Sequence, residues 1–229
     1  MNDNKHTLKI IGHIHTDFPE KFGIPRQSGI DNSLKGVITF LPEYGQEEAF
    51  RGLDEYSHIW VIWSFSENPD RPFNATVKPP RLGGNKRMGV FATRSPFRPN
   101  DIGLSCLKLD SVKLTEDGPV LLVSGVDQMD GTPIYDIKPY IPYTDCHTDA
   151  VGGFADKVMG HKLNVEFPEE LLDYFPDDKK AGIITVLKDD PRPAYHNNED
   201  RRYGVSYAGM DVHFTVKDDV LTVFEVVKL

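Results

Sequence analysis

Cysteine, long apolar runs and an excess of positive charge are scarce or missing in this chain of 229 residues. Its two cysteines, Cys106 and Cys146, are too few for a disulfide framework and lack the CxxC spacing of a zinc site, so we expect ordinary thiols. No stretch approaches the roughly 18 uncharged apolar residues that a membrane span requires, and the amino terminus lacks a signal-peptide core. We therefore expect a cytoplasmic protein with no membrane association.

The net charge is negative, at −9, because 26 Lys and Arg residues face 35 Asp and Glu residues. This balance argues against a protein that coats nucleic acid or an anionic membrane through its overall charge. One segment departs from it, since residues 73–100 hold basic side chains and no acidic one: Lys78, Arg81, Lys86, Arg87, Arg94 and Arg98. Gly and Pro interrupt this segment, so we expect loops whose cations either contact phosphates or are simply solvated.

Several catalytic signatures are also missing. The chain has no GxGxxG after a strand, no GxxxxGK[ST], no GxSxG, and no HExxH or Cys/His cluster. These absences argue against doubly wound nucleotide folds, phosphate-loop enzymes, hydrolases with a nucleophile elbow, and zinc or iron sites. We expect no metal.

Short segments with apolar alternation or β-branched and aromatic enrichment dominate the first part of the chain. They cover residues 8–14, 37–40, 58–65, 90–92, 104–109 and 120–126, and only residues 46–52 favour a helix between them. The 19 Gly and 17 Pro residues supply the turns. This pattern predicts a mainly β fold, a barrel or a sandwich, as a single domain over residues 1–147.

The rest of the chain predicts a second, smaller unit. Residues 148–160 are small and polar, which is typical of a linker. Two short helices are predicted over 168–175 and 178–187, followed by strands over 203–207, 211–216 and 220–227 and a hairpin turn at 217–219. We therefore expect a small α+β C-terminal domain over residues 161–229.

Three loop segments offer candidate binding groups. Residues 25–27 lie between Gly23 and Gly29, and this tight loop could grip a small polar ligand with Arg and amide donors. Arg94 follows the strand predicted at 90–92, where it could bind a ligand carboxylate or form a structural ion pair. Residues 127–140 carry carboxylates at a bend after a predicted strand, a common place for binding groups.

Five ordered blocks resemble the TsaA/TrmO family, the S-adenosylmethionine-dependent tRNA methyltransferases O. The blocks are PRQ at 25–27, RGLDEYSHIWV at 51–61, VKPPRLGG at 77–84, MGVFATRSPFRPNDIGLS at 88–105 and DGTPIYDIKPY at 130–140. DPRPAY at 190–195 is similar to a block in the C-terminal domain of bacterial members. The resemblance implies a homodimeric β-barrel methyltransferase that uses S-adenosylmethionine. It also implies action on the anticodon arm of tRNA, at N6 of threonylcarbamoyladenosine 37, as in threonine tRNA.

The resemblance further implies a set of cofactor-binding residues. They are Pro25, Arg26, Gln27, Ser66, Glu67, Arg94, Leu104, Asp127, Gln128, Met129 and Asp130. This set can supply donors for the carboxylate of S-adenosylmethionine, acceptors for its ammonium group and an apolar wall. The chain departs from many relatives at two places: Ser66-Glu67 replaces His-Gln, and Asp101 replaces the proline of FRPNP.

The acceptor nitrogen is carbamoylated and must lose a proton. We hypothesise that Asp136, with Lys138 beside it, assists that proton loss or orients the modified base. The alternative is a structural ion pair at the base of a loop.

Binding of tRNA by an acidic chain requires local cations. We predict phosphate contacts for Lys86, Arg87 and Arg98. Arg192 and Tyr195 could pair with a phosphate and stack on a loop base, or they could pin the Pro-rich segment to the barrel.

Two other functions fit the same sequence. A noncatalytic barrel of OB type could bind RNA with aromatic faces and basic loops, and would need no cofactor pocket. A methyltransferase of this fold could also act on a small molecule or a different RNA, because a fold does not dictate a function.

Overall fold

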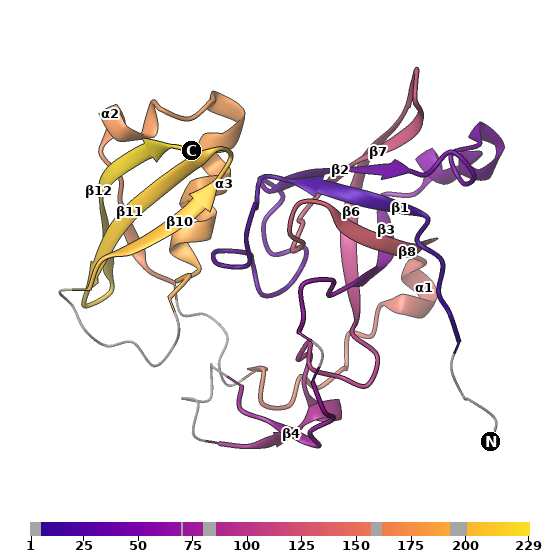
Figure 1. The fold of residues 1–229 in the computed structure, drawn as a ribbon, viewed down its shortest axis with the longest axis horizontal. Coiled ribbons are helices and arrows are strands. Elements are labelled where there is room, and N and C mark those ends of the chain that lie inside the picture. Colours follow the sequence, from indigo (N-terminus) through magenta and orange to yellow (C-terminus); the bar gives the residue numbers. More distant parts are fainter. Residues whose placement is uncertain (1–5, 70, 80–85, 157–161, 193–200) are drawn as a thin grey trace.

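A closed barrel of antiparallel strands forms the first part of the molecule (Figure 1). The computed structural model describes residues 6–69, 71–79, 86–156, 162–192 and 201–229. The barrel strands are β1 (Gly12–Thr16), β2 (Lys35–Phe40), β3 (His58–Ser64), β6 (Ile102–Thr115), β7 (Gly118–Ser124) and β8 (Thr132–Pro139). They are hydrogen-bonded in the order β1-β2-β7-β6-β3-β8. The predicted mainly β class and the predicted barrel are confirmed.

The barrel interior is built by the period-2 alternation of its strands. In β3, Ile59, Val61 and Trp63 are buried, whereas the side chains between them are partly exposed. Each fully buried aliphatic or aromatic side chain contributes about 1.5–3 kcal/mol. The same alternation on neighbouring strands fills the interior, with side chains that are fully buried: Ile14, Ile38, Leu107, Leu121 and Ile134.

Short elements surround the barrel. They are the 3₁₀ turns η1 (Glu47–Phe50), η2 (Leu53–Glu55) and η4 (Val90–Ala92), the strands β4 (Thr76–Val77) and β5 (Met88–Gly89), and the helix α1 (Pro142–Asp145). The strand predicted over 90–92 is wrong, because these residues form η4. The Thr93 hydroxyl donates to the Val90 carbonyl at 2.8 Å and closes the turn, and Phe91 is 71% exposed instead of facing a core.

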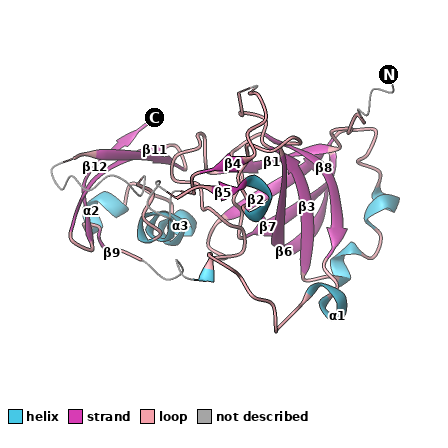
Figure 2. Ribbon diagram, turned by 90° about the horizontal axis from the view of Figure 1, so that it is seen from below, coloured by secondary structure: helices cyan, strands magenta, loops and turns pink. Residues whose placement is uncertain are grey.

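The C-terminal part contains a four-stranded sheet in the order β10-β11-β12-β9. Its elements are β9 (Asn164–Glu166), α2 (Glu169–Leu172), α3 (Asp177–Lys188), β10 (Tyr203–Tyr207), β11 (Met210–Lys217) and β12 (Val220–Lys228). Figure 2 shows α3 along one side of this sheet. None of the described helices is long and apolar enough to cross a membrane. The two helices and three of these strands match the prediction, whereas the three-residue β9 is too short to carry a periodic signal.

The C-terminal part packs on the loop that joins β1 to β2, which extends towards it in Figure 1. Lys179 of α3 pairs with Asp17 of this loop at 2.6 Å, and Thr185 Oγ1 donates to Asp31 Oδ2 at 2.8 Å. Gly23 has a φ of +88°, and a Cβ there would lie 2.3 Å from the Val205 side chain. These contacts hold the β1–β2 loop against the C-terminal part. The domain boundaries at 147 and 161 stay a prediction.

Candidate functional site

Four loops meet at one end of the barrel. They are residues 17–34 after β1, 65–68 after β3, 93–101 before β6 and 125–131 between β7 and β8. Neighbouring strands are antiparallel, so the carboxyl ends of β1, β3 and β7 lie at the same end as the amino ends of β6 and β8. The topology thus brings together segments that are more than 100 residues apart in the chain.

Hydrogen bonds join these loops to one another. The Gly29 backbone N–H donates to the Gly125 carbonyl at 2.9 Å. Asn68 Nδ2 donates to the Pro96 carbonyl at 3.1 Å. A Cβ at Gly125 would lie 2.9 Å from the Gly29 Cα, so this close approach of two backbones requires glycine. The four loops form one connected cluster.

Arg94, Gln27 and Arg26 form a chain of polar contacts at the surface of this cluster. The Arg94 guanidinium donates to Gln27 Oε1, and Gln27 Nε2 donates to the Arg26 carbonyl. All three side chains are exposed, whereas the neighbouring Pro25 is buried. Arg94 follows the η4 turn, not the strand end that the sequence predicted. The Arg94 guanidinium and the Gln27 amide thus lie together in one exposed place and suit an anionic ligand group, whereas the Arg26 guanidinium donates to the Arg192 carbonyl at 3.4 Å.

Asp127 lies beneath this group and accepts a hydrogen bond from Ser105. Ser105 Oγ donates to Asp127 Oδ1 at 2.6 Å, and Trp63 Nε1 donates to Ser105 Oγ at 2.9 Å. Burial raises the pKa of Asp127 to about 6, while the Ser105 bond and the charge of Arg94 oppose that rise. Such a carboxylate can receive a cationic ligand group. The sequence analysis missed Ser105 and Trp63, although Ser105 is a polar residue at an inward position of an alternating strand.

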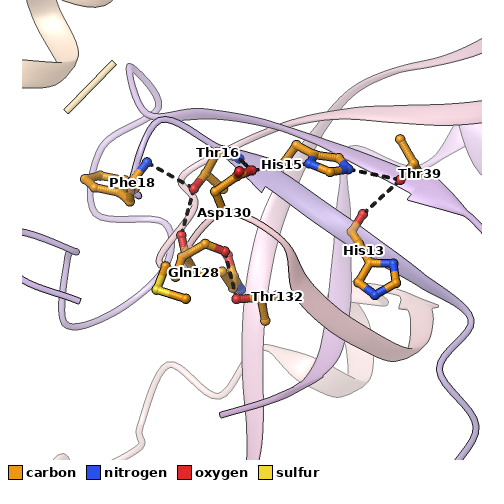
Figure 3. Close-up of polar contacts among 9 residues, drawn as sticks. His13, His15, Thr16, Phe18, Thr39, Gln128, Asp130 and Thr132 are labelled. Atoms are coloured by element: carbon orange, nitrogen blue, oxygen red, sulfur yellow. Dashed lines mark hydrogen bonds and ion pairs between the residues drawn. The ribbon is translucent and has the colours of Figure 1, made fainter. Parts of the chain in front are cut away.

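The rest of the 127–130 turn is fixed from β1 (Figure 3). The Thr16 hydroxyl donates to the Gln128 carbonyl at 3.0 Å, and the Thr16 N–H donates to Asp130 Oδ1 at 3.1 Å. His15 Nδ1 lies 3.2 Å from the same oxygen, and the Met129 carbonyl accepts a bond from a threonine of β8. These contacts bring the turn, as predicted, next to the other site loops.

Gln128 carries a polar atom that the described residues leave unsatisfied. Its side chain is 1% exposed, and its Nε2 has no hydrogen-bond partner in the described part of the chain. Its Oε1 accepts the Asp127 N–H at 3.1 Å. Buried amide groups are nearly always paired, so this N–H₂ is suited to an acceptor on a bound ligand.

Ser66 and Glu67 form the turn after β3, and Leu104 lies elsewhere. The Lys21 ammonium donates to the Glu67 carbonyl, which joins this turn to the β1–β2 loop. Leu104 points to the outside of the barrel, opposite Ile62 on β3, and is 55% exposed. Its neighbour Ser105, not Leu104, contacts the Asp127 carboxylate. The structure therefore brings most of the predicted cofactor residues together, but it places the Leu104 side chain on a different face.

Asp136 and Lys138 lie on that outward face. Their side chains form an ion pair of 2.8 Å, and both are about half exposed. The hydrogen bond that Lys138 donates to Asp136 raises the pKa of Lys138. Ile62 pairs with Asp136 on one side and with Leu104 on the other, so Leu104, Ile62 and Asp136 form a row across three strands. Strand β8 itself was not predicted, because Pro133, Pro139 and charged residues mask its alternation.

The predicted phosphate-binding residues differ in their exposure and in their hydrogen bonds to other protein groups. Lys86 and Arg87 are exposed next to β5, and Arg87 Nη1 donates to Thr76 Oγ1 at 2.8 Å. Arg98 Nη1 donates to the carbonyls of Val90 and Thr93 at 3.2 and 2.7 Å. Arg98 therefore holds the η4 turn.

Arg192 is engaged within its own segment. It forms two parallel hydrogen bonds to Asp190, of 2.8 and 2.9 Å, and its carbonyl accepts one from Arg26 at 3.4 Å. This geometry favours the pinning alternative, and Tyr195 lies outside the described residues. A cavity of about 200 Å³ lies here between Arg26 and Val186, below the roughly 300–1,000 Å³ of a typical ligand pocket, so it could take only part of a small ligand.

Comparisons with known proteins agree over both parts of the chain. Residues 13–146 match the tRNA-methyltransferase O N-terminal domain, and residues 161–229 match the TrmO C-terminal domain. A tRNA (adenine(37)-N6)-methyltransferase from Escherichia coli K12 is 39% identical over 93% of this chain and 94% of its own length.

A relative and a solved structure from Pseudomonas aeruginosa are also similar. The relative, RcsF, has a name that describes an S-adenosylmethionine-dependent methyltransferase, and it is 39% identical over 96% of this chain and 97% of its own length. The crystal structure of TrmO from this organism superimposes with a TM-score of 0.78 and 35% identity, covering 98% of each chain.

Proposed function

Because the chain belongs to the tRNA-methyltransferase O family, we propose that it methylates N6 of threonylcarbamoyladenosine at position 37 of tRNA, threonine tRNA included. The chain is an S-adenosylmethionine-dependent tRNA (adenine-N6)-methyltransferase. The observation that carries the proposal is the meeting of Arg94, Gln27 and Asp127 at one end of the barrel, with charges that match a zwitterionic donor.

The donor site fits S-adenosylmethionine. Arg94, Arg26 and Gln27 offer hydrogen bonds to its carboxylate, and Asp127 offers a negative charge to its ammonium group. The unpartnered Gln128 Nε2 is available for an acceptor on the nucleoside part. The sulfonium supplies an electrophilic methyl group, so the main task of the protein is to align the donor with the acceptor nitrogen.

The chemical step is a displacement at the methyl carbon. A bond forms between N6 and the methyl carbon, the sulfur–methyl bond breaks, and the sulfur leaves as the thioether of S-adenosylhomocysteine. The N6 lone pair is delocalised into the ring and the carbamoyl group, so N6 must lose its proton. We assign this proton to the Asp136 carboxylate, which Lys138 orients through their 2.8 Å ion pair. Asp136 lies on the outward face and not among the donor loops, so the assignment requires the modified base to reach from the donor site onto that face.

The outward face that carries Asp136 also supports a homodimer. Ile102 and Leu104 of β6 are 37% and 55% exposed there, which is an apolar surface that a second copy could cover. The dimer is part of the proposal, as is a reaction in the cytoplasm, where the substrate tRNA is found.

Lys86 and Arg87 are the proposed contacts to the anticodon arm. Both are exposed, and they lie on a segment without acidic residues. Arg98 and Arg192 are partly buried and are bonded to carbonyl and carboxylate groups, so a phosphate role is weaker for these two than for the exposed Arg87, which donates one bond to the Thr76 hydroxyl.

Mass spectrometry of tRNA nucleosides tests the proposed function. A deletion strain should lack N6-methyl-N6-threonylcarbamoyladenosine and accumulate its unmethylated precursor, and the wild-type gene should restore the product. The Asp136→Asn gene should restore little, since loss of a general base costs about 10²–10⁴-fold in rate. Full restoration by this variant would remove Asp136 from the mechanism. An unchanged nucleoside profile in the deletion strain would overturn the substrate and favour another RNA or a noncatalytic role.

A further inference from the structure

A hydrogen-bond chain runs from the barrel interior to Asp127. Trp63 Nε1 donates to Ser105 Oγ at 2.9 Å, and Ser105 Oγ donates to Asp127 Oδ1 at 2.6 Å. An indole N–H can only donate, so Ser105 Oγ accepts from Trp63 and its own hydrogen remains to be donated to Asp127. Asp127 Oδ1 is therefore an acceptor, as expected for an ionised carboxylate.

The first two members of this chain are held in place by packing. The Trp63 ring lies against Gly103, where an added Cβ would come within 2.2 Å of the indole. Its other neighbour is the Phe65 ring, at a centroid distance of 4.3 Å. The Ser105 side chain is 1% exposed, so solvent does not compete for its hydroxyl. The Ser105 hydroxyl is thus confined to one orientation.

We propose that Ser105, oriented by Trp63, is a positioning residue that keeps Asp127 aligned and ionised for the ammonium group of the methyl donor. The inference rests on the proposed function, because it takes Asp127 as the partner of that ammonium group. Ser105 acts through Asp127 and does not touch the donor.

The charges around Asp127 determine the expected pH dependence. Burial raises the pKa of Asp127 to about 6. The opposing groups come from several segments: the Ser105 hydroxyl on β6, the backbone amides of Asp127 and Ser28, and the Arg94 guanidinium. Only ionised Asp127 attracts an ammonium group, so donor affinity should fall as the pH drops through this range. Removal of the Ser105 hydroxyl takes away one opposing group, so the midpoint should move to higher pH.

Calorimetric titration of the full chain with S-adenosylmethionine, between about pH 5 and about pH 9, tests the inference. For Ser105→Ala we expect the midpoint to rise by about one pH unit, which weakens binding about fivefold near pH 6, close to tenfold near pH 5, and by less than about twofold near pH 8.5. Ser124→Ala is the matched control. Ser124 is equally buried, and its hydroxyl donates to Asp110 instead of to Asp127, so its pH profile should follow the wild type.

Two further variants keep the inference testable. Trp63→Phe keeps an aromatic ring but loses the indole N–H, so its midpoint should move in the same direction as that of Ser105→Ala, by a smaller amount. A Ser105→Ala profile that superimposes on the wild type would overturn the positioning role and leave the proposed function intact. Wild-type affinity in Asp127→Asn would instead overturn the donor assignment, and the inference with it.

Discussion

Two carboxylates on the barrel accept a hydrogen bond from a buried serine, yet their pKa values move in opposite directions. Ser105 donates to Asp127, and Ser124 donates to Asp110. Burial raises the pKa of Asp127 to about 6. Burial also acts to raise the pKa of Asp110, but its serine and two nearby lysines outweigh that effect, and the pKa is lowered.

The difference lies in the cations that the fold supplies. Lys35 lies 3.0 Å from Asp110 and Lys108 lies 3.6 Å from it, so the negative charge is neutralised within the protein. Asp127 forms no comparable ion pair in the described structure and is balanced only by the more distant charge of Arg94. Asp110 is therefore a structural group, whereas Asp127 keeps a negative charge available for a ligand. The carboxylate suited to ligand binding is therefore the one whose negative charge nearby lysines do not neutralise.

Donor affinity should separate the two carboxylates most strongly. In Asp127→Asn the negative charge is lost from a buried site, and we expect S-adenosylmethionine to bind about 10²–10³-fold more weakly near pH 7.5. In Asp110→Asn the affinity should stay within about twofold, because Asp110 does not face the donor. Calorimetry on both variants measures this, and equal losses in the two would break the comparison.

Stability should change in opposite directions in the same two variants. The folded pKa of Asp127 is raised, so ionising it destabilises the fold as the pH rises through about 4 to 6. Asp127→Asn should thus be more stable than the wild type by about 2 kcal/mol near pH 8, with the gap closing near pH 4. The pKa of Asp110 is lowered, so Asp110→Asn should lose about 1 kcal/mol at neutral pH. Urea unfolding at several pH values measures both changes, and a destabilised Asp127→Asn at pH 8 would contradict the account.

The smallest expected effect is on tRNA affinity. It concerns two exposed cations, Lys86 and Arg87, which are not paired with a carboxylate in the way that Lys35 is paired with Asp110. Replacement of Lys86 and Arg87 by Ala should weaken tRNA binding about tenfold at low salt and reduce the salt slope by about two units. Lys113→Ala is the control, because this exposed lysine lies towards the opposite end of β6. Filter binding across a range of salt concentrations measures the slope. A slope that remains at the wild-type value would remove both residues from the interface.

The sequence predicted the barrel strands well where β-branched and aromatic residues were concentrated. Residues 58–65 and 120–126 are such segments, and both are strands within one or two residues of the predicted bounds. Residues 90–92 have strand-like composition but no partner strand, and they form a 3₁₀ turn. Strand β8 contains prolines and an ion pair, and its pairing with β1 and β3 overrides these local preferences. The 161–229 region was predicted in nearly all its elements, because its helices and hairpin are local.

In the candidate site too, some features were predictable from the sequence and others depended on the pairing of the strands. Ordered blocks in the sequence were enough to identify the family, and through it to predict the methyl donor and the loops of the candidate site, since each block is a contiguous stretch. Only the closed barrel decided that Trp63, Ser105 and Asp127 form one chain, because 42 and 22 residues separate the bonded pairs. It also decided that Leu104 faces outwards with Asp136, since the inward or outward direction of a strand residue depends on the register with both neighbouring strands.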